Sequence, residues 1–187
     1  MALERTTLLK LHLVLAALVL PVAVMFAVTG ALYTWGVKGD YVTSKYPLAL
    51  PAPAPTDKDA LVSLATAALA ERDLAPPTGT PAVKESSKGA LLEWTGSQRD
   101  ITLEPGEQPD QMLLTVKETD THRQFVQLHK AKGGIAFKVY AAFFALSLVL
   151  VLASGVLMAV QMPKYRALLL GSAGAGLVLF AVMVLVS

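Results

Sequence analysis

Few residues of this sequence could take part in chemistry. The chain has three histidines, His12, His122 and His129, and no cysteine. The lack of cysteine excludes disulfides, thiol catalysis, cysteine-ligated zinc and iron-sulfur clusters. No Ser-His-Asp order and no glycine-rich phosphate loop is found after a predicted strand. We therefore expect no catalytic residue and no metal site, and the histidines remain as candidate ligand residues.

Charged residues are distributed very unevenly along the chain. The stretch from Lys38 to Lys138 carries 25 of the 30 charges, whereas residues 11–37, 139–163 and 167–187 carry none. Each uncharged run can cross a bilayer, because about 20 apolar residues span its hydrocarbon core. The sequence thus predicts three transmembrane helices with one polar insert. The net charge of +2 without a basic cluster argues against nucleic acid as a partner.

The expected organisation and orientation follow from the same pattern. Short segments at the ends of the spans keep Arg5, Lys10, Lys164 and Arg166 on one side, which the positive-inside rule makes cytoplasmic. The insert and the carboxyl terminus then lie outside. The expected segments are a cytoplasmic tail (1–10), span one (11–37), a Pro-rich linker (38–55), an insert domain (56–130), span two (134–162), a cytoplasmic loop (163–166) and span three (167–187).

The insert is predicted to be a small α+β domain. Pro47, Pro51, Pro53 and Pro55 favour a polyproline II tether over residues 41–55. After it, apolar residues at helical spacing predict a helix that Thr56 caps and that ends near Leu74. Strands are predicted over residues 90–95, 100–104 and 112–119, with a turn at Asp120 and Thr121 and a short fourth strand over 124–128. One helix against a small antiparallel sheet is the simplest fold.

The first two spans share an internal similarity. Thr29-Gly30 in span one and Ser154-Gly155 in span two occur in matching runs, and a Leu-His pair precedes each span, at Leu11-His12 and Leu128-His129. The alternative is coincidence, because small residues such as Gly30 and Gly155 are common where membrane helices pack closely.

These residues carry a resemblance to the PepSY-associated transmembrane family of bacteria. The Leu-His pairs, Thr29-Gly30, Gly133-Gly134 and Ser154-Gly155 match its pattern, and the insert resembles a single PepSY domain. The resemblance implies a bacterial inner-membrane protein with a periplasmic domain. Larger relatives have four or more spans and more histidines, whereas this chain stops after three.

The resemblance implies two different functions. Some relatives look like haem-bearing reductases of siderophore-bound iron, and others have no known cofactor and look accessory or regulatory. A b-type haem usually takes two histidines at one membrane depth, whereas His12 and His129 are expected at opposite ends of a core of roughly 30 Å. A homodimer could pair His12 with its copy and His129 with its copy.

We therefore favour a non-catalytic accessory, scaffolding or regulatory component without a cofactor. The alternative is a haem b electron-transfer or ferric-reductase component that uses His12 and His129. Without a ligand, both histidines would be interfacial residues.

Span three is rich in small residues. Gly171, Gly174 and Gly176 lie in one run, and the pairs Gly171/Ala175 and Ser172/Gly176 have the spacing that allows close helix contact. We expect this face to pack against a membrane-protein partner or a second copy of the chain. The alternative is packing against span one or two of the same chain.

The predicted orientation can be tested with reporter fusions. Fusions after Ser97 and at Ser187 should report an external location, and a fusion within residues 163–166 should report a cytoplasmic one, because the short segments keep the basic residues. Activity of paired phosphatase and fluorescent reporters measures this. An external signal from the 163–166 fusion would contradict the orientation.

Overall fold

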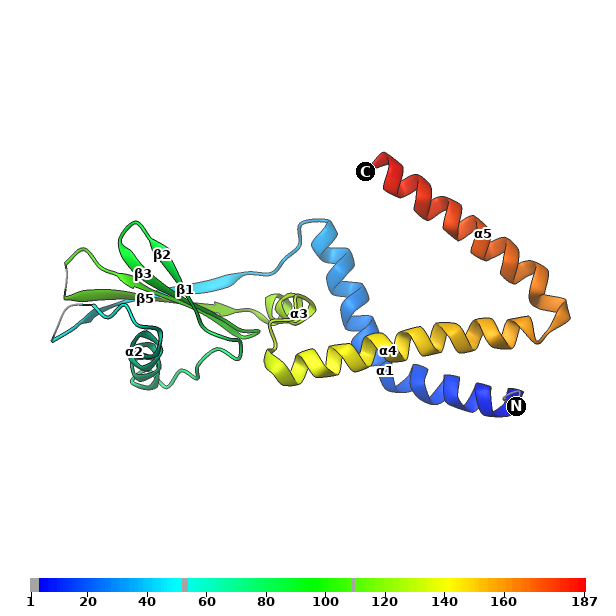
Figure 1. Ribbon diagram of the computed structural model, residues 1–187, viewed down its shortest axis with the longest axis horizontal. Coiled ribbons are helices and arrows are strands. Elements are labelled where there is room, and N and C mark those ends of the chain that lie inside the picture. The colour runs from blue at the N-terminus through cyan, green and yellow to red at the C-terminus, as the bar shows by residue number, and fades with distance from the viewer. Residues whose placement is uncertain (1–3, 52–53, 109) are drawn as a thin grey trace. The chain divides into compact units, whose positions relative to one another are not determined.

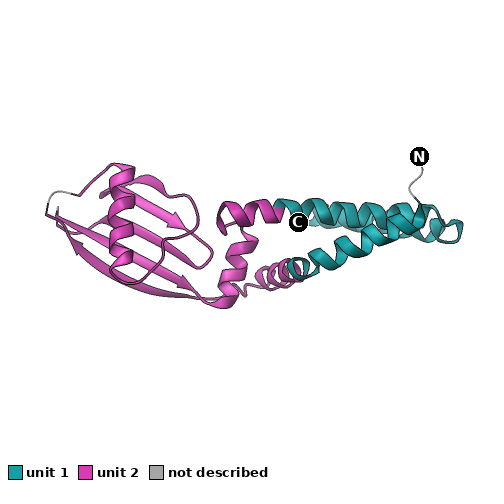
Figure 2. Cartoon of the chain, turned by 90° about the horizontal axis from the view of Figure 1, so that it is seen from below, with its two compact units in different colours: residues 1–23, 142–187 teal, residues 24–141 magenta. Residues whose placement is uncertain are grey.

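The computed structural model describes residues 4–51, 54–108 and 110–187, which form two compact units. Figure 2 shows them in different colours: one consists of residues 1–23 and 142–187, and the other of residues 24–141. The boundary within the first helix falls just after Pro21, which has no N–H to donate to the helix.

Within the described residues, three helices are long and apolar enough to cross a membrane, as predicted. They are α1 (Arg5–Thr34), α4 (Gly134–Val160) and α5 (Pro163–Val186). Pro163 at the first turn of α5 is well placed, because its fixed φ suits a helix start and no N–H is needed there. α1 begins six residues earlier than the expected span and ends at Thr34, and the chain then turns at Gly36.

The insert contains a five-stranded antiparallel sheet in the order β1-β5-β4-β3-β2 (Figure 1). The predicted strands correspond to β3 (Gly89–Thr95), β4 (Arg99–Pro105) and β5 (Gln111–Thr119). Two strands were not predicted, β1 (Tyr41–Ala49) and β2 (Ala82–Ser86).

The prediction of a polyproline tether is wrong for residues 41–49, which form β1. Pro47 pairs with Leu113 of β5 but occupies an edge strand, where a residue without an N–H is tolerated. Tyr46 and Leu48 of β1 pack against the apolar core, and this burial favours a strand. Ala52 and Pro53, in the middle of the predicted tether, lie outside the described residues.

The sheet is covered on one face by α2 (Lys58–Ala70), as Figures 1 and 2 show. The helix is capped by Asp57 rather than by Thr56, because the Asp57 carboxylate accepts from the backbone N–H groups of Asp59 and Ala60. It ends before the predicted Leu74. The core is formed by one face of α2 and the inward residues of the central strands: Leu61, Ala65, Ala68, Leu69, Leu92, Ile101, Leu103, Met112, Leu114 and Val116.

The prediction of a fourth strand over residues 124–128 is wrong, because these residues belong to α3 (Thr121–His129). The short run Gln-Phe-Val-Gln-Leu mixes polar and apolar residues without a strict period and is too short to distinguish the two elements. Asp120 decides the outcome as the N-cap, since its carboxylate accepts from the Arg123 N–H at 2.5 Å. The predicted turn at Asp120 and Thr121 is the start of this helix.

Replacing Leu114 with Ala should lower the free energy of unfolding of the domain by about 2–5 kcal/mol, because Leu114 is fully buried and the change leaves a cavity. Urea unfolding followed by tryptophan fluorescence measures this. Leu113→Ala in the same strand, on the other face, is the matched control and should cost clearly less. Equal costs for the two variants would contradict the placement of the core.

Candidate functional site

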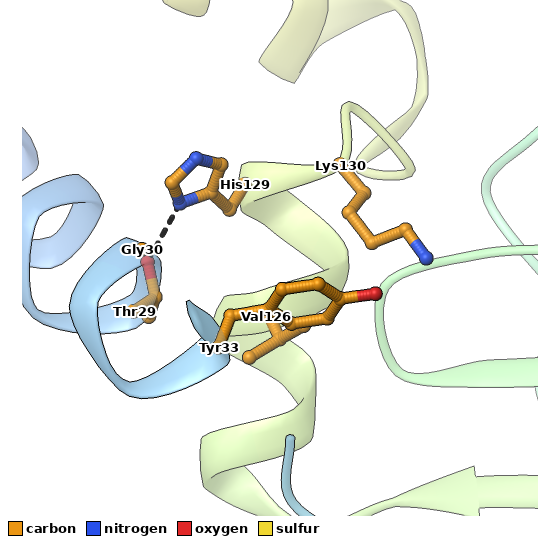
Figure 3. A pocket seen from close by; sticks show the side chains of 6 residues that line it. All are labelled: Thr29, Gly30, Tyr33, Val126, His129 and Lys130. Atoms are coloured by element: carbon orange, nitrogen blue, oxygen red, sulfur yellow. Dashed lines mark hydrogen bonds between the residues drawn. The ribbon is translucent and has the colours of Figure 1, made fainter. Parts of the chain in front are cut away.

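His129 lies against the Thr29-Gly30 pair of α1, within the unit of residues 24–141 (Figure 3). Its Nδ1 is 2.8 Å from the Thr29 hydroxyl, and Thr29 is buried. A Cβ atom added to Gly30 would lie 3.2 Å from the imidazole Cε1, which is tighter than ordinary van der Waals contact. The Thr29 hydroxyl therefore fixes the position of the His129 ring, and Gly30 leaves space for that ring.

The hydrogen bonds of Thr29 fix which nitrogen of His129 carries a proton. The Thr29 hydroxyl lies 2.6 Å from the backbone carbonyl of Met25, and only the hydroxyl can supply the proton of that bond. The Thr29 oxygen can then only accept from His129, so the proton lies on Nδ1. In the neutral imidazole, Nε2 consequently keeps its lone pair.

A second site of the same kind lies in the other unit. The Nδ1 of His12 is 2.9 Å from the Ser154 hydroxyl, which donates to the Val151 carbonyl at 2.9 Å. By the same reasoning, His12 donates through Nδ1 and presents an unprotonated Nε2 when neutral. A Cβ atom at Gly155 would lie 3.9 Å from the His12 ring, in ordinary contact.

In each site, the histidine of one of the two similar sequences bonds to the hydroxyl-glycine pair of the other. His12 belongs to α1 and bonds to the hydroxyl-glycine pair of α4, whereas His129 precedes α4 and bonds to the pair of α1. The sequence revealed the two copies and both histidines, but not the exchange of partners. A contact between positions so far apart in the chain leaves no local signal.

The surroundings of His129 include a pocket of about 330 Å³. It is lined by Thr29, Gly30, Tyr33, Val126, His129 and Lys130 (Figure 3). The Phe26 ring lies 4.5 Å from the imidazole ring, between centroids. Among the residues that the structure describes, no three His, Asp or Glu side chains converge as a metal ion would require.

The position of His129 depends on how α3 is held against the sheet. Gln127, fully buried in α3, donates to the Tyr41 hydroxyl at 2.7 Å and to Asp100 at 3.0 Å. Asp100 also accepts from Tyr41 at 2.9 Å and lies 3.3 Å from the Lys132 ammonium. One carboxylate of β4 thus binds β1, α3 and the segment after α3.

Two shifted pKa values belong to this region. Burial, which removes water from the phenolate, raises the pKa of Tyr41, so its hydroxyl stays protonated and donates to Asp100. Backbone hydrogen bonds from Arg123 and then from Asp40 lower the pKa of the Asp120 carboxyl. The Asp120 cap therefore contributes to stability above its unfolded pKa, and this contribution is lost as the pH falls through the lowered value.

The remaining residues singled out in the sequence lie elsewhere. His122 is the second residue of α3 rather than part of a turn, and its Nε2 lies 3.3 Å from the Val37 carbonyl. A Cβ atom built at Gly171, Gly174 or Gly176 of α5 meets nothing within 4 Å.

The fold and the two sites define a membrane protein with an α+β domain between its first two spans, in which one histidine-hydroxyl contact joins the two spans and another joins α1 to α3. Residues 2–161 match the family described as "PepSY-associated TM region". The chain therefore belongs to this family, which confirms the resemblance seen in the sequence. No curated protein and no solved structure matches the chain significantly. The family match contains both histidine sites, and α5 follows it.

Replacing Thr29 with Val should remove the acceptor of His129 and release its tautomer. We expect the ¹⁵N chemical shifts of His129 to move from the Nδ1–H form toward a mixture, while Thr29→Ser keeps the Nδ1–H form. A double-mutant cycle of Thr29→Val with His129→Phe should give a coupling of about 0.6 kcal/mol, the average for hydrogen bonds in membranes. An Nε2–H tautomer in the unmodified protein would contradict the assignment.

Proposed function

We propose that this protein is a non-catalytic accessory, scaffolding or regulatory component of a membrane complex, which binds another membrane protein or a second copy of itself through α5. The observation that carries the proposal is the exposure of α5: none of its residues is buried, although it is a full-length span. Its glycines approach no other part of the described chain.

The composition of α5 supports a protein partner. Membrane helices gain no hydrophobic energy from meeting one another, so their association depends on close packing and hydrogen bonds. Small residues at four-residue spacing allow that close packing, whereas they make few van der Waals contacts with lipid alone. The alternative, packing of α5 on its own chain, is not found among the described residues, which leaves its small-residue face for a partner.

The proposed setting is the bacterial inner membrane, with the amino terminus in the cytoplasm and the α+β domain in the periplasm. The membrane location follows from the three spans and the family. The orientation rests on the basic residues Arg5, Lys10, Lys164 and Arg166.

Replacing Gly174 with Leu should weaken the association by about 1–2 kcal/mol, on the scale of interhelical contacts in model peptides. Co-purification and crosslinking in mild detergent measure the loss. Val184→Leu is the matched control, because Val184 is exposed on the side of the same helix away from the small-residue pairs and the change adds a single methylene. If the Gly174 variant keeps every crosslink of the parent, α5 is a plain lipid-facing anchor.

A second candidate function, haem b electron transfer, is favoured by the histidine tautomers. A haem-ligating histidine uses one ring nitrogen and commonly donates its other N–H to a supporting acceptor. His12 and His129 have this arrangement, with Nδ1 held by a hydroxyl and no partner for Nε2 within residues 4–51, 54–108 and 110–187. Each site therefore fits one axial ligand, and a bound haem b would supply one-electron transfer.

Each site contains one histidine, so a six-coordinate haem would need a second ligand from another chain. If haem is bound, a reduced-minus-oxidised absorption spectrum of the purified protein should show a b-type signal that His129→Ala diminishes. His122→Ala is the control and should keep it. A protein purified with haem present in the growth medium that gives no such signal would eliminate this candidate.

A further inference from the structure

The pocket beside His129 has apolar walls and a cationic rim. Gly30, Tyr33 and Val126 contribute apolar surface, and Lys130 is exposed at its edge. The Lys38 ammonium lies 5.1 Å from the centre of the Tyr33 ring, and the Lys130 ammonium lies 5.8 Å from the same ring. Two cations thus flank one aromatic wall of the pocket.

Lys38 and Lys130 have no anionic partner in the part of the chain that the structure describes. Among the described residues, neither Lys38 nor Lys130 has a carboxylate within 4 Å, although four ion pairs form elsewhere. Two carboxylates belong to this region, that of Asp120, which caps α3, and that of Asp40, whose backbone N–H donates to Asp120. Among the described residues neither carboxylate forms an ion pair with Lys38 or Lys130, so an anion beside these lysines would gain their attraction.

The pocket lies at the end of a membrane span. Tyr33 is in the last turn of α1, and Trp35 follows it with 86% of its surface exposed. Tyrosine and tryptophan concentrate at the headgroup level of membranes. Ile135 and Val139, in the first turns of α4, are exposed apolar side chains suited to lipid. A ligand here would meet hydrocarbon on one side and water on the other.

We propose that this pocket binds an anionic phospholipid, with its phosphate at the rim near Lys130 and Lys38 and an acyl chain along Gly30, Tyr33 and Val126. Charge complementarity selects the anionic headgroup, and the apolar wall selects a lipid over free phosphate. The inference uses neither the haem candidate nor the contacts of α5, and it holds for either orientation of the chain.

The test is native mass spectrometry of the full chain in detergent, titrated with phosphatidylglycerol or phosphatidylcholine of identical acyl chains. The unmodified protein should retain phosphatidylglycerol preferentially and saturably. The variant Lys38→Gln/Lys130→Gln should bind it roughly 10- to 30-fold more weakly, since each basic residue near an anionic surface contributes about a fivefold factor or slightly less. Lys45→Gln/Lys88→Gln removes the same charge from exposed positions of the domain and should bind like the parent.

A second measurement needs no variant. In lipid nanodiscs, brominated phosphatidylglycerol should quench the fluorescence of Trp35 more than brominated phosphatidylcholine does, because the lipid would be held beside Tyr33. Equal retention of both lipids, equal quenching, or equal binding by the two double variants would overturn the proposal. Competition by inorganic phosphate at matched concentration would instead assign the pocket to the free anion, and would also overturn it.

Discussion

A hydroxyl group has one proton, and this constraint determines both histidine sites. Thr29 and Ser154 each give that proton to a carbonyl of their own helix, so each oxygen can only accept from an imidazole. An unpaired polar group within a bilayer costs several kcal/mol, so each hydroxyl satisfies a helix carbonyl and a histidine together. Gly30 leaves space for the His129 ring, whereas a Cβ atom at Gly155 would only be in ordinary contact with His12.

The two histidines are nevertheless supported in different ways. His12 is part of a continuous helix, and its ring position follows from α1 itself. His129 is the last residue of α3, which the buried Gln127 and the Asp100 carboxylate attach to the sheet. Gly39 permits this attachment, because its φ is +69° and a Cβ atom there would lie 2.5 Å from the Arg123 nitrogen. The domain between the spans therefore positions His129, whereas membrane helices position Thr29, His12 and Ser154.

The sequence predicted the features that depend on local composition. Uncharged length revealed the three spans, and alternation revealed β3, β4 and β5. It failed for β1, because Pro47 reads as a strand breaker unless the strand is known to be at an edge. It failed for α3, because five residues cannot distinguish a period of 2 from 3.6 when the cap is not recognised. Both histidines and both hydroxyl-glycine pairs were identified, but their crosswise pairing and the bonds of Asp100 join distant positions and could not be predicted.

The short connection between α3 and α4, at residues 131–134, separates His129 from the span that follows it. Ala131 and Gly134 have φ values of +59° and +76°, and a Cβ atom at Gly134 would lie 2.7 Å from the Thr78 carbonyl oxygen. Transmembrane helices adapt to a thicker or thinner bilayer by changing their tilt. Because α4 begins at residue 134 while α3 is bonded to the sheet, a change in the tilt of α4 would first act on the backbone of residues 131–134. The contact of His129 with Thr29 would then depend on the tilt of α1 more than on that of α4, because Thr29 belongs to α1.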